Sequence, residues 1–273
     1  MIDVFKKHGN TMTNIVIVGY PKSGNTWVTQ LVAELVKCPV IGFWDSDHND
    51  SAQEGLDRKS EFQCFKSHHQ LHELRGSRTL SEKRIIYVIR DPRDIAVSGA
   101  YYFFMERWPS IAKLFGRFAK GRGFYSNIIN PLITPRSYRI KQMVHAVLYG
   151  SKYVHHWVRI PWETHYKPYL ENKCFFVKYE DLLDAPAHEC NRILGYLGLD
   201  RQDTHIREAI KRQSFKNKKE AFLKNNEIYK ADLLRVGKSG QWRQELSGKQ
   251  KDKFIKILSE ELRQFAYPTD SNI

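Results

Sequence analysis

The residues with the clearest chemical potential lie in one short segment, Gly19–Trp27, with the sequence GYPKSGNTW. The segment combines two glycines, a lysine, two hydroxyl side chains and an amide between an apolar run and a stretch with helical spacing. In a strand–loop–helix arrangement, the N–H groups of the turn and of the helix N-terminus converge on one point, where the helix dipole adds positive potential. The segment therefore predicts a site for a phosphate or sulfate group, with Lys22 as a mobile charge.

This loop differs from the loop of nucleoside triphosphatases, G-x-x-x-x-G-K-[ST]. Gly19 and Gly24 have the spacing of that motif, but Asn25 and Thr26 follow where it has Lys and then Ser or Thr. The lysine of this chain, Lys22, lies inside the loop instead. Magnesium coordination is therefore not expected here. A simple tight turn would not account for Lys, Ser and Thr together.

A second candidate phosphate site follows the run Arg84–Arg90 (RIIYVIR), which is typical of a buried strand. Residues 91–104 then predict a helix with a proline in its first turn. Ser98 lies about two turns into that helix. Arginine binds phosphate through two parallel hydrogen bonds, and a hydroxyl can donate beside it. Arg90 alone would be interpreted as an exposed charge, but with Ser98 and the first loop it favours phosphate binding.

Three histidines follow Glu61–Lys66 (EFQCFK), a candidate strand: His68, His69 and His72. An imidazole titrates near neutral pH and can act as a general base. A single histidine is more often structural than catalytic. The residue types alone therefore leave the role of this group open.

The segments around these residues alternate between strand-like and helix-like patterns. Thr13–Gly19 (TNIVIVG) is typical of a strand buried on both faces, and Gly24–Lys37 follows it with helical spacing. The other elements that we expect are a strand at Lys173–Tyr179 and helices at Met143–Trp157, Glu180–Leu199, Gln202–Lys211 and Gly248–Phe265. Irregular chain is expected at Cys38–Ser60, loops at Met105–Arg139, and a polar, mobile segment at Lys216–Gly240. The alternation predicts an α/β fold with a central parallel sheet flanked by helices. Because no linker is visible, residues 1–273 are predicted to form a single domain, with an N-terminal arm at residues 1–13.

The composition limits the class of protein. The chain has 273 residues, 41% of them hydrophobic, and a formal net charge of +14. The hydrophobic fraction excludes a disordered chain. The net charge fits a polyanionic partner such as nucleic acid, an anionic membrane or a phosphorylated ligand, and it fits a solvated, lysine-rich surface equally well. Its apolar runs are too short to span a membrane, and the first ten residues carry no apolar signal region. Four cysteines without C-x-x-C spacing predict reduced thiols in a cytoplasmic protein and no metal site.

The segment Tyr-Pro-Lys-Ser-Gly-x-Thr-Trp resembles the 5′-phosphosulfate loop of the cytosolic-type sulfotransferases. These enzymes have a P-loop-containing nucleotide-binding fold and transfer a sulfuryl group from 3′-phosphoadenosine-5′-phosphosulfate (PAPS) to an acceptor, leaving adenosine 3′,5′-bisphosphate (PAP). The resemblance implies that the loop binds the nucleotide through Lys22, Ser23, Gly24, Asn25, Thr26 and Trp27.

Further segments resemble the same family in the same order along the chain. Arg90 and Ser98 match its 3′-phosphate segment, and Lys66-Ser67-His68 resembles its Lys-Thr-His, whose histidine is the general base. The alignment of Lys66-Ser67-His68 with Lys-Thr-His favours His68 as the base, although His69 lies beside it. Tyr149–His155 (YGSKYVH) resembles the Tyr-Gly-Ser-Trp segment near the acceptor pocket, with lysine in place of tryptophan.

The remaining matches concern the adenine and the 3′-phosphate. Tyr179 matches a tyrosine that approaches adenine, and Gln213–Lys216 (QSFK) resembles Thr-Ser-Phe-Lys, which assigns Ser214 and Phe215 to the nucleotide. Arg235–Trp242 (RVGKSGQW) resembles Arg-Lys-Gly-x-x-Gly-Asp-Trp, a segment that closes over the 3′-phosphate. Its nucleotide-binding residues here would be Arg235, Val236 and Gly237. Valine and glutamine replace the family's lysine and aspartate, and Lys238 is a candidate substitute donor.

The resemblance implies in-line sulfuryl transfer without a metal, with His68 as the base and with Lys22 and Lys66 stabilising the developing charge. The acceptor is expected to be a small molecule with a hydroxyl or amine, and tailoring of a microbial secondary metabolite is one such role. Candidate acceptor contacts are Phe43, Tyr101 and Tyr149. No nucleic acid or membrane partner is expected.

The oligomeric state and two rival functions stay open. Residues Arg243–Gln250 lack the Thr-Val pair of the vertebrate dimer segment, so that dimer is not assumed. A small-molecule or nucleoside kinase would show magnesium-dependent turnover of ATP. A basic nucleic-acid-binding protein would show steeply salt-dependent binding, but the chain offers it no recognition motif.

Overall fold

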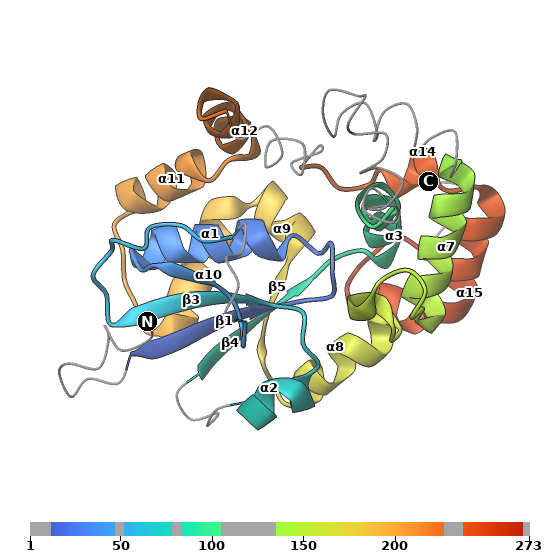
Figure 1. Ribbon diagram of the computed structural model, residues 1–273, viewed down its shortest axis with the longest axis horizontal. Coiled ribbons are helices and arrows are strands. Elements are labelled where there is room, and N and C mark those ends of the chain that lie inside the picture. The colour runs from blue at the N-terminus through green and yellow to red at the C-terminus, as the bar shows by residue number, and fades with distance from the viewer. Residues whose placement is uncertain (1–11, 47–51, 78–82, 105–134, 227–236, 270–273) are drawn as a thin grey trace, which may run out of the picture. The chain divides into compact units, whose positions relative to one another are not determined.

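The computed structural model describes residues 12–46, 52–77, 83–104, 135–226 and 237–269 (Figure 1). The chain forms two compact units, each assembled from three separate segments. Unit 1 contains residues 1–19, 24–88 and 173–234, and unit 2 contains residues 20–23, 89–172 and 235–273. Neither unit is a continuous stretch of sequence, which explains why no linker is visible.

Unit 1 is built on a five-stranded parallel sheet with the order β2-β3-β1-β4-β5. The strands are β1 (Thr13–Val18), β2 (Val40–Phe43), β3 (Phe62–Ser67), β4 (Lys83–Ile89) and β5 (Phe175–Lys178). Strand β1 lies between β3 and β4, and Val18 pairs with Ser67 of β3. Because these strands are parallel and in register at their ends, Gly19 and His68 follow adjacent carboxyl ends of the sheet.

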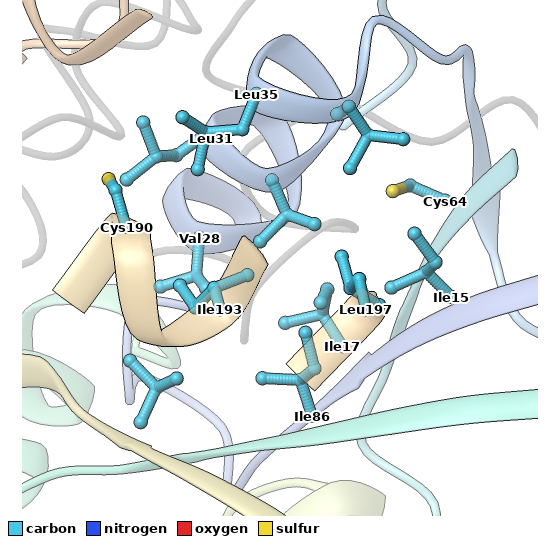
Figure 2. Close-up of a cluster of buried hydrophobic side chains, with 14 of the residues drawn as sticks. Ile15, Ile17, Val28, Leu31, Leu35, Cys64, Ile86, Cys190, Ile193 and Leu197 are labelled. Atoms are coloured by element: carbon cyan, nitrogen blue, oxygen red, sulfur yellow. The ribbon is translucent and has the colours of Figure 1, made fainter. Parts of the chain in front are cut away.

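The helices of unit 1 are α1 (Asn25–Val36), α2 (Leu71–Ser77), α9 (Tyr179–Asp184), α10 (Pro186–Leu197), α11 (Asp203–Arg212) and α12 (Phe215–Lys224). Helices α1 and α10 pack on the same face of the sheet (Figure 1). Figure 2 shows this core, in which Val28 and Leu31 of α1 and Ile193 of α10 meet Ile17 of β1 and Ile86 of β4. The apolar residues of α1 recur at helical spacing, so one side of the helix is buried against the sheet.

Strand β1 is buried on both of its faces. Ile15 and Ile17 belong to the core of Figure 2, and Val16 and Val18, which alternate with them, are equally inaccessible to solvent. A strand in the middle of a parallel sheet has this two-sided burial, which favours a continuous β-branched run over an alternating pattern. The predicted α/β fold with a central parallel sheet is therefore confirmed.

Unit 2 is helical in the described residues. It contains α3 (Pro92–Tyr102), α7 (Arg136–Tyr149), the short 3₁₀ helix η3 (His156–Val158), α8 (Trp162–Glu171), α14 (Trp242–Glu245) and α15 (Gly248–Gln264). Helix α3 begins at the predicted proline, and the carboxylate of Asp91 accepts a hydrogen bond from the N–H of Arg93. Tyr20 is fully buried in this unit, and its hydroxyl donates to the carbonyl of Ile160 at 3.1 Å.

Some predicted elements have different boundaries. Helix α7 begins at Arg136 and not at Met143, because Pro135 precedes its first turn, and it ends before Gly150, whose φ is +78°. Strand β2 lies inside the segment expected to be irregular; its four residues include a glycine, which weakens a strand pattern.

Further predictions fall partly outside the described residues. The segment expected to be polar and mobile begins with helix α12, and its residues 227–236 lie outside the described part. The same applies to residues 105–134 of the expected loops and to most of the N-terminal arm. Among the helices that the structure describes, none combines the length and the apolar character needed to cross a membrane.

Candidate active site

The start of α1 lies close to Tyr179 in unit 1. Gly24 precedes the helix with φ +98°, and no side chain caps the helix N-terminus. A Cβ atom at Gly24 would lie 2.7 Å from the ring of Tyr179, so only glycine permits this approach. The uncapped first-turn N–H groups are a suitable site for an anion.

Aromatic side chains from two segments of unit 1 meet beside this helix terminus. The ring of Trp27 meets the ring of Tyr179 edge-on, with 5.6 Å between centroids. The indole N–H of Trp27 donates to the carbonyl of Gln213 at 2.8 Å, next to Ser214 and Phe215. The structure therefore brings these sequence-predicted adenine contacts to one part of unit 1.

Glu54 holds the beginning of α12 and was missed by sequence reasoning. Its carboxylate accepts hydrogen bonds from Gln213 at 2.9 Å and from Lys218 at 2.6 Å. Ser214 caps the helix by accepting from the N–H of Asn217. The only sequence signal was the replacement of the family's threonine by Gln213, which reaches far enough to meet a carboxylate.

His68 is oriented by main-chain and amide groups at the ends of β1 and β3. Its Nδ1 lies 2.8 Å from the carbonyl oxygen of Gly19. The side-chain nitrogen of Asn25 lies 3.0 Å from the same oxygen, 2.9 Å from the carbonyl oxygen of Ser67 and 3.2 Å from Nδ1 of His68. Because a carbonyl oxygen only accepts hydrogen bonds, the contact with Gly19 is a hydrogen bond in the tautomer that carries its proton on Nδ1.

Phe43 and His69 complete the surroundings of His68. The ring of Phe43 lies 5.7 Å from that of His68 and 5.6 Å from that of His69, and Lys66 Nζ lies 5.7 Å from its centroid. His69 is tied to Ser67, whose hydroxyl lies 3.0 Å from its Nδ1. Burial lowers the pKa of His69, against the opposing charges of Glu73 and Asp45.

In unit 2, the residues Tyr20–Ser23 form a tight turn. The N–H of Ser23 donates to the carbonyl of Tyr20 at 3.1 Å, Pro21 occupies the second position, and Lys22 adopts φ +74°. This is the pattern of a type II turn, in which glycine is normally found at the position of Lys22. A residue held at positive φ aims its neighbouring N–H groups inward, a geometry that binds anions.

Arg90 connects this turn with the C-terminal part of unit 2. Its guanidinium donates to the carbonyl of Lys22 at 3.0 Å and to the carbonyl of Lys238 at 3.1 Å. Lys22 Nζ lies 3.7 Å from the centroid of the Tyr102 ring, a cation–π contact. Arg90 and Lys22 thus lie together, with Gly237 adjoining Lys238 in sequence.

Asp94 anchors the same C-terminal segment and was also missed by sequence reasoning. Its carboxylate accepts the N–H of Gly240 at 2.6 Å and the N–H of Trp242 at 3.1 Å. Burial raises the pKa of Asp94, while the charge of Arg90 acts in the opposite direction. Arg93, fully buried, pairs with Asp91 at 2.7 Å and lies 3.7 Å from the Trp242 ring.

The comparison with known families agrees with this geometry. The model of the sulfotransferase domain matches residues 12–266 of the chain. The chain belongs to the sulfotransferase family. Its enzyme class is that of the PAPS-dependent sulfotransferases, as its motifs predicted.

Similar proteins cover most of this sulfotransferase. Human sulfotransferase 2A1 is 24% identical over 91% of this chain and 84% of its own length. The 3-beta-hydroxysteroid sulfotransferase of Cavia porcellus is 26% identical over 90% of this chain and 83% of its own length. The crystal structure of mouse sulfotransferase SULT7A1 complexed with PAP superposes with a TM-score of 0.65 at 21% identity, covering 92% of this chain and 85% of that one. A retinol dehydratase in complex with androsterone and PAP has a TM-score of 0.59 at 17% identity, covering 91% and 80%.

The loop of the sulfotransferase contains a polar group whose position fits an anionic ligand. The hydroxyl oxygen of Ser23 is buried and makes no hydrogen bond with any described residue. A buried hydroxyl without a partner costs free energy unless a ligand satisfies it. Together with the positive φ of the neighbouring Lys22, this orphaned donor fits a phosphate or sulfate group in unit 2.

The remaining site residues predicted from the sequence are not part of the groups described above. Ser98 is half-buried on α3. Tyr101 faces Arg136 and Arg139, and Tyr149 is 47% exposed and packs against Lys253. Arg235 and Val236 lie outside the described residues. Within the described ranges, no group of three or more His, Cys, Asp or Glu side chains is placed to hold a metal ion.

Proposed function

We propose that this sulfotransferase moves the sulfuryl group of PAPS to a hydroxyl or amine of a small-molecule acceptor, with His68 as the general base. The observation that carries the proposal is the 2.8 Å contact between His68 Nδ1 and the carbonyl oxygen of Gly19, the residue that directly follows β1. This contact makes Nε2 the basic nitrogen, and it fixes the ring relative to the end of β1.

His68 would accept the acceptor proton at Nε2 while the acceptor oxygen or nitrogen bonds to sulfur. PAPS supplies a sulfuryl group that is already activated by its bond to phosphate. Lys66 in unit 1 and Lys22 in unit 2 would stabilise the negative charge that develops on the leaving oxygen. One preorganised donor of this kind contributes about 3–4 kcal/mol to the lowering of the barrier.

The nucleotide-binding roles are proposed from both units. In unit 1, the N-terminal N–H groups of α1, with Gly24, Asn25 and Thr26, would bind the 5′-phosphate. In unit 2, the proposed 5′-phosphate donors are Lys22 and Ser23. The proposed 3′-phosphate donors are Arg90, Ser98, Arg235, Val236 and Gly237.

The adenine would be bound by the aromatic group of unit 1. Trp27 and Tyr179 meet edge-on at 5.6 Å, and Trp27 is hydrogen-bonded to the chain directly before Ser214 and Phe215. Aromatic faces stack on nucleobases with about 1–3 kcal/mol for each base. The hydrogen bonds of Glu54 support this assignment, because they hold the start of α12 in place.

Phe43 is the best-supported acceptor contact, since its ring lies beside both His68 and His69. An apolar ring next to the base suits a hydroxyl carried on an apolar skeleton. Among the similar proteins are a hydroxysteroid sulfotransferase and a structure solved with androsterone, which makes sterols and related alcohols the first class to test. The contacts of Tyr101 and Tyr149 with charged side chains support an acceptor role less well.

A cytoplasmic, reducing location is part of the proposal. The four cysteines are free thiols, and burial raises the pKa of Cys190 to about 12, which keeps that thiol protonated.

The test is a calorimetric titration of the full chain with PAP, followed by an acceptor panel with PAPS in EDTA that measures release of PAP. The panel holds apolar alcohols, phenols and amines. We expect PAP binding and metal-independent turnover of at least one acceptor class. A folded protein that does not bind PAP, or that turns over ATP only with magnesium, contradicts the proposal.

A further inference from the structure

Asn25 joins three groups that come from the ends of two neighbouring strands. It is the first residue of α1 and is 3% exposed. Its side-chain nitrogen donates to the carbonyl of Gly19, which follows β1, and to the carbonyl of Ser67, the last residue of β3. The same nitrogen lies 3.2 Å from Nδ1 of His68. All of these atoms belong to unit 1.

The orientation of the Asn25 amide is determined by these neighbours. If the amide were flipped, its oxygen would face two carbonyl oxygens at 2.9–3.0 Å, where only a donor is favourable. Gly19 allows the amide to pack closely, because a Cβ atom there would lie 2.7 Å from Oδ1 of Asn25.

A count of hydrogens then determines the state of His68. The amide nitrogen of Asn25 has two hydrogens, and two carbonyl oxygens accept them. None is left to donate to Nδ1 of His68, so Nδ1 carries its own hydrogen and donates it to Gly19, whose oxygen has a second lone pair. Because Asn25 bonds the carbonyls of both Gly19 and Ser67, it also fixes the distance between the backbone before His68 and the end of β1.

We infer that Asn25 is a positioning residue that holds His68 in the Nδ1–H tautomer, so that Nε2 is the nitrogen that accepts a proton. This inference rests on the proposed function only for its effect on rate. It also refines the expectation that Asn25 binds the nucleotide: both amide hydrogens are already used, which leaves the main-chain N–H of Asn25 for the anion.

The first measurement requires no turnover. The full chain is labelled with ¹⁵N-histidine, and long-range ¹H–¹⁵N spectra are recorded between pH 6 and pH 9, with and without PAP. The His68→Gln variant identifies the signals of this ring. We expect the neutral ring of His68 to carry its proton on Nδ1 in the wild type, and a wild-type ring with the proton on Nε2 overturns the inference.

Two substitutions separate positioning from a general structural effect. Asn25→Ala removes both donors and should give mixed tautomers of His68, with kcat lowered about 10–100-fold and the Kd for PAP changed less than about 3-fold. Asn25→Asp places a carboxylate beside the ring and should raise the apparent pKa in the pH profile of kcat by about 1 unit. Asn25→Ser, which restores one donor, should recover part of the loss.

The matched control is Asn191→Ala on α10, where an exposed amide donates to the carbonyl of Ala187 in the same unit. This variant should leave the spectra of His68 and the pH profile unchanged. Unchanged tautomer and kcat in Asn25→Ala contradict the inference. If Asn25→Ala does not fold, the wild-type spectra and the Asn25→Asp titration decide. Failure of the wild type to bind PAP would bring down the proposed function and leave the tautomer result standing.

Discussion

The surroundings of His68 in unit 1 and of Arg90 in unit 2 differ in the charge of the neighbouring side chains. His68 is held by neutral groups, namely the carbonyls of Gly19 and Ser67 and the amide of Asn25. The guanidinium of Arg90 also donates to main-chain carbonyls, those of Lys22 and Lys238, but charged side chains surround it. These are Asp94 and the buried pair of Asp91 and Arg93. In the proposed function, His68 changes its protonation state during the reaction, whereas Arg90 keeps its charge.

This difference indicates a division of labour. The hydrogen bond to the Gly19 carbonyl favours the tautomer of the His68 imidazole that carries its proton on Nδ1. Arginine keeps its charge at any physiological pH and can satisfy phosphate oxygens. Substitutions around His68 should therefore change mainly the rate, and those around Arg90 mainly the affinity for the nucleotide.

The largest expected effect tests the neutral region. His68→Ala should lower kcat at least about 100-fold, because the acceptor proton loses its base. The Kd for PAP, measured by calorimetry, should change less than about 3-fold. His69→Ala is the control, since its ring is tied to the Ser67 hydroxyl. Retained turnover in His68→Ala, with loss in His69→Ala, would move the base to His69.

The second effect tests the charged region. Arg90→Ala should raise the Kd for PAP about 10–100-fold, since charged hydrogen bonds contribute about 1.5–3 kcal/mol. At saturating PAPS, kcat should fall much less than in His68→Ala. Arg84→Ala is the matched control, because Arg84 is exposed on β4, the strand that Arg90 directly follows. If Arg90→Ala lowered kcat and left the Kd unchanged, the proposed division of labour would be wrong.

A smaller effect is expected for the anchor of the C-terminal segment. Asp94→Ala leaves the N–H groups of Gly240 and Trp242 without their acceptor. The free energy of unfolding should fall by about 1–3 kcal/mol, as measured by urea denaturation, and the Kd for PAP should rise because Gly237 belongs to the same segment. Asp203→Ala, at an exposed carboxylate, should leave both values unchanged.

The smallest effect concerns His155 in unit 2. It tests whether protonation of a histidine other than His68 changes the stability of the folded protein. Burial, and then the neighbouring His156, lower the pKa of His155 from 6.5 to about 4. As the pH falls, His155 binds its proton in the unfolded chain at a higher pH than in the folded protein. The stabilising contribution of the neutral ring is therefore fully present above about pH 6.5 and is lost as the pH falls towards 4. Because the ring is half-exposed, we expect protonation of His155 to lower the free energy of unfolding by about 1–2 kcal/mol.

The measurement compares urea unfolding of the wild type and His155→Gln at pH 7 and pH 5. The wild type should lose more stability than the variant over this interval. Equal losses would show that His155 does not contribute. The pH profile of kcat should be the same in both proteins if the base is His68.

Much of the fold was predictable because its signals are local. The β-branched run of β1, the glycine-containing loop and the helical spacing of α1 each depend on residues a few positions apart. The parallel sheet followed from the alternation of such segments. The start of α7 was predicted at Met143, where the apolar helical spacing becomes clear. The helix begins earlier, at Arg136, because the fixed φ of Pro135 favours the start of a helix.

What the sequence determined by itself was the chemical inventory: a phosphate-type loop, an arginine after a strand, a histidine after another, and the family to which they belong. The tertiary structure decided the partners. Asn25 meets His68 across 43 residues and Asp94 meets Gly240 across 146. Contacts over such separations depend on which strands and helices are neighbours and on how they are aligned, and no local pattern specifies either.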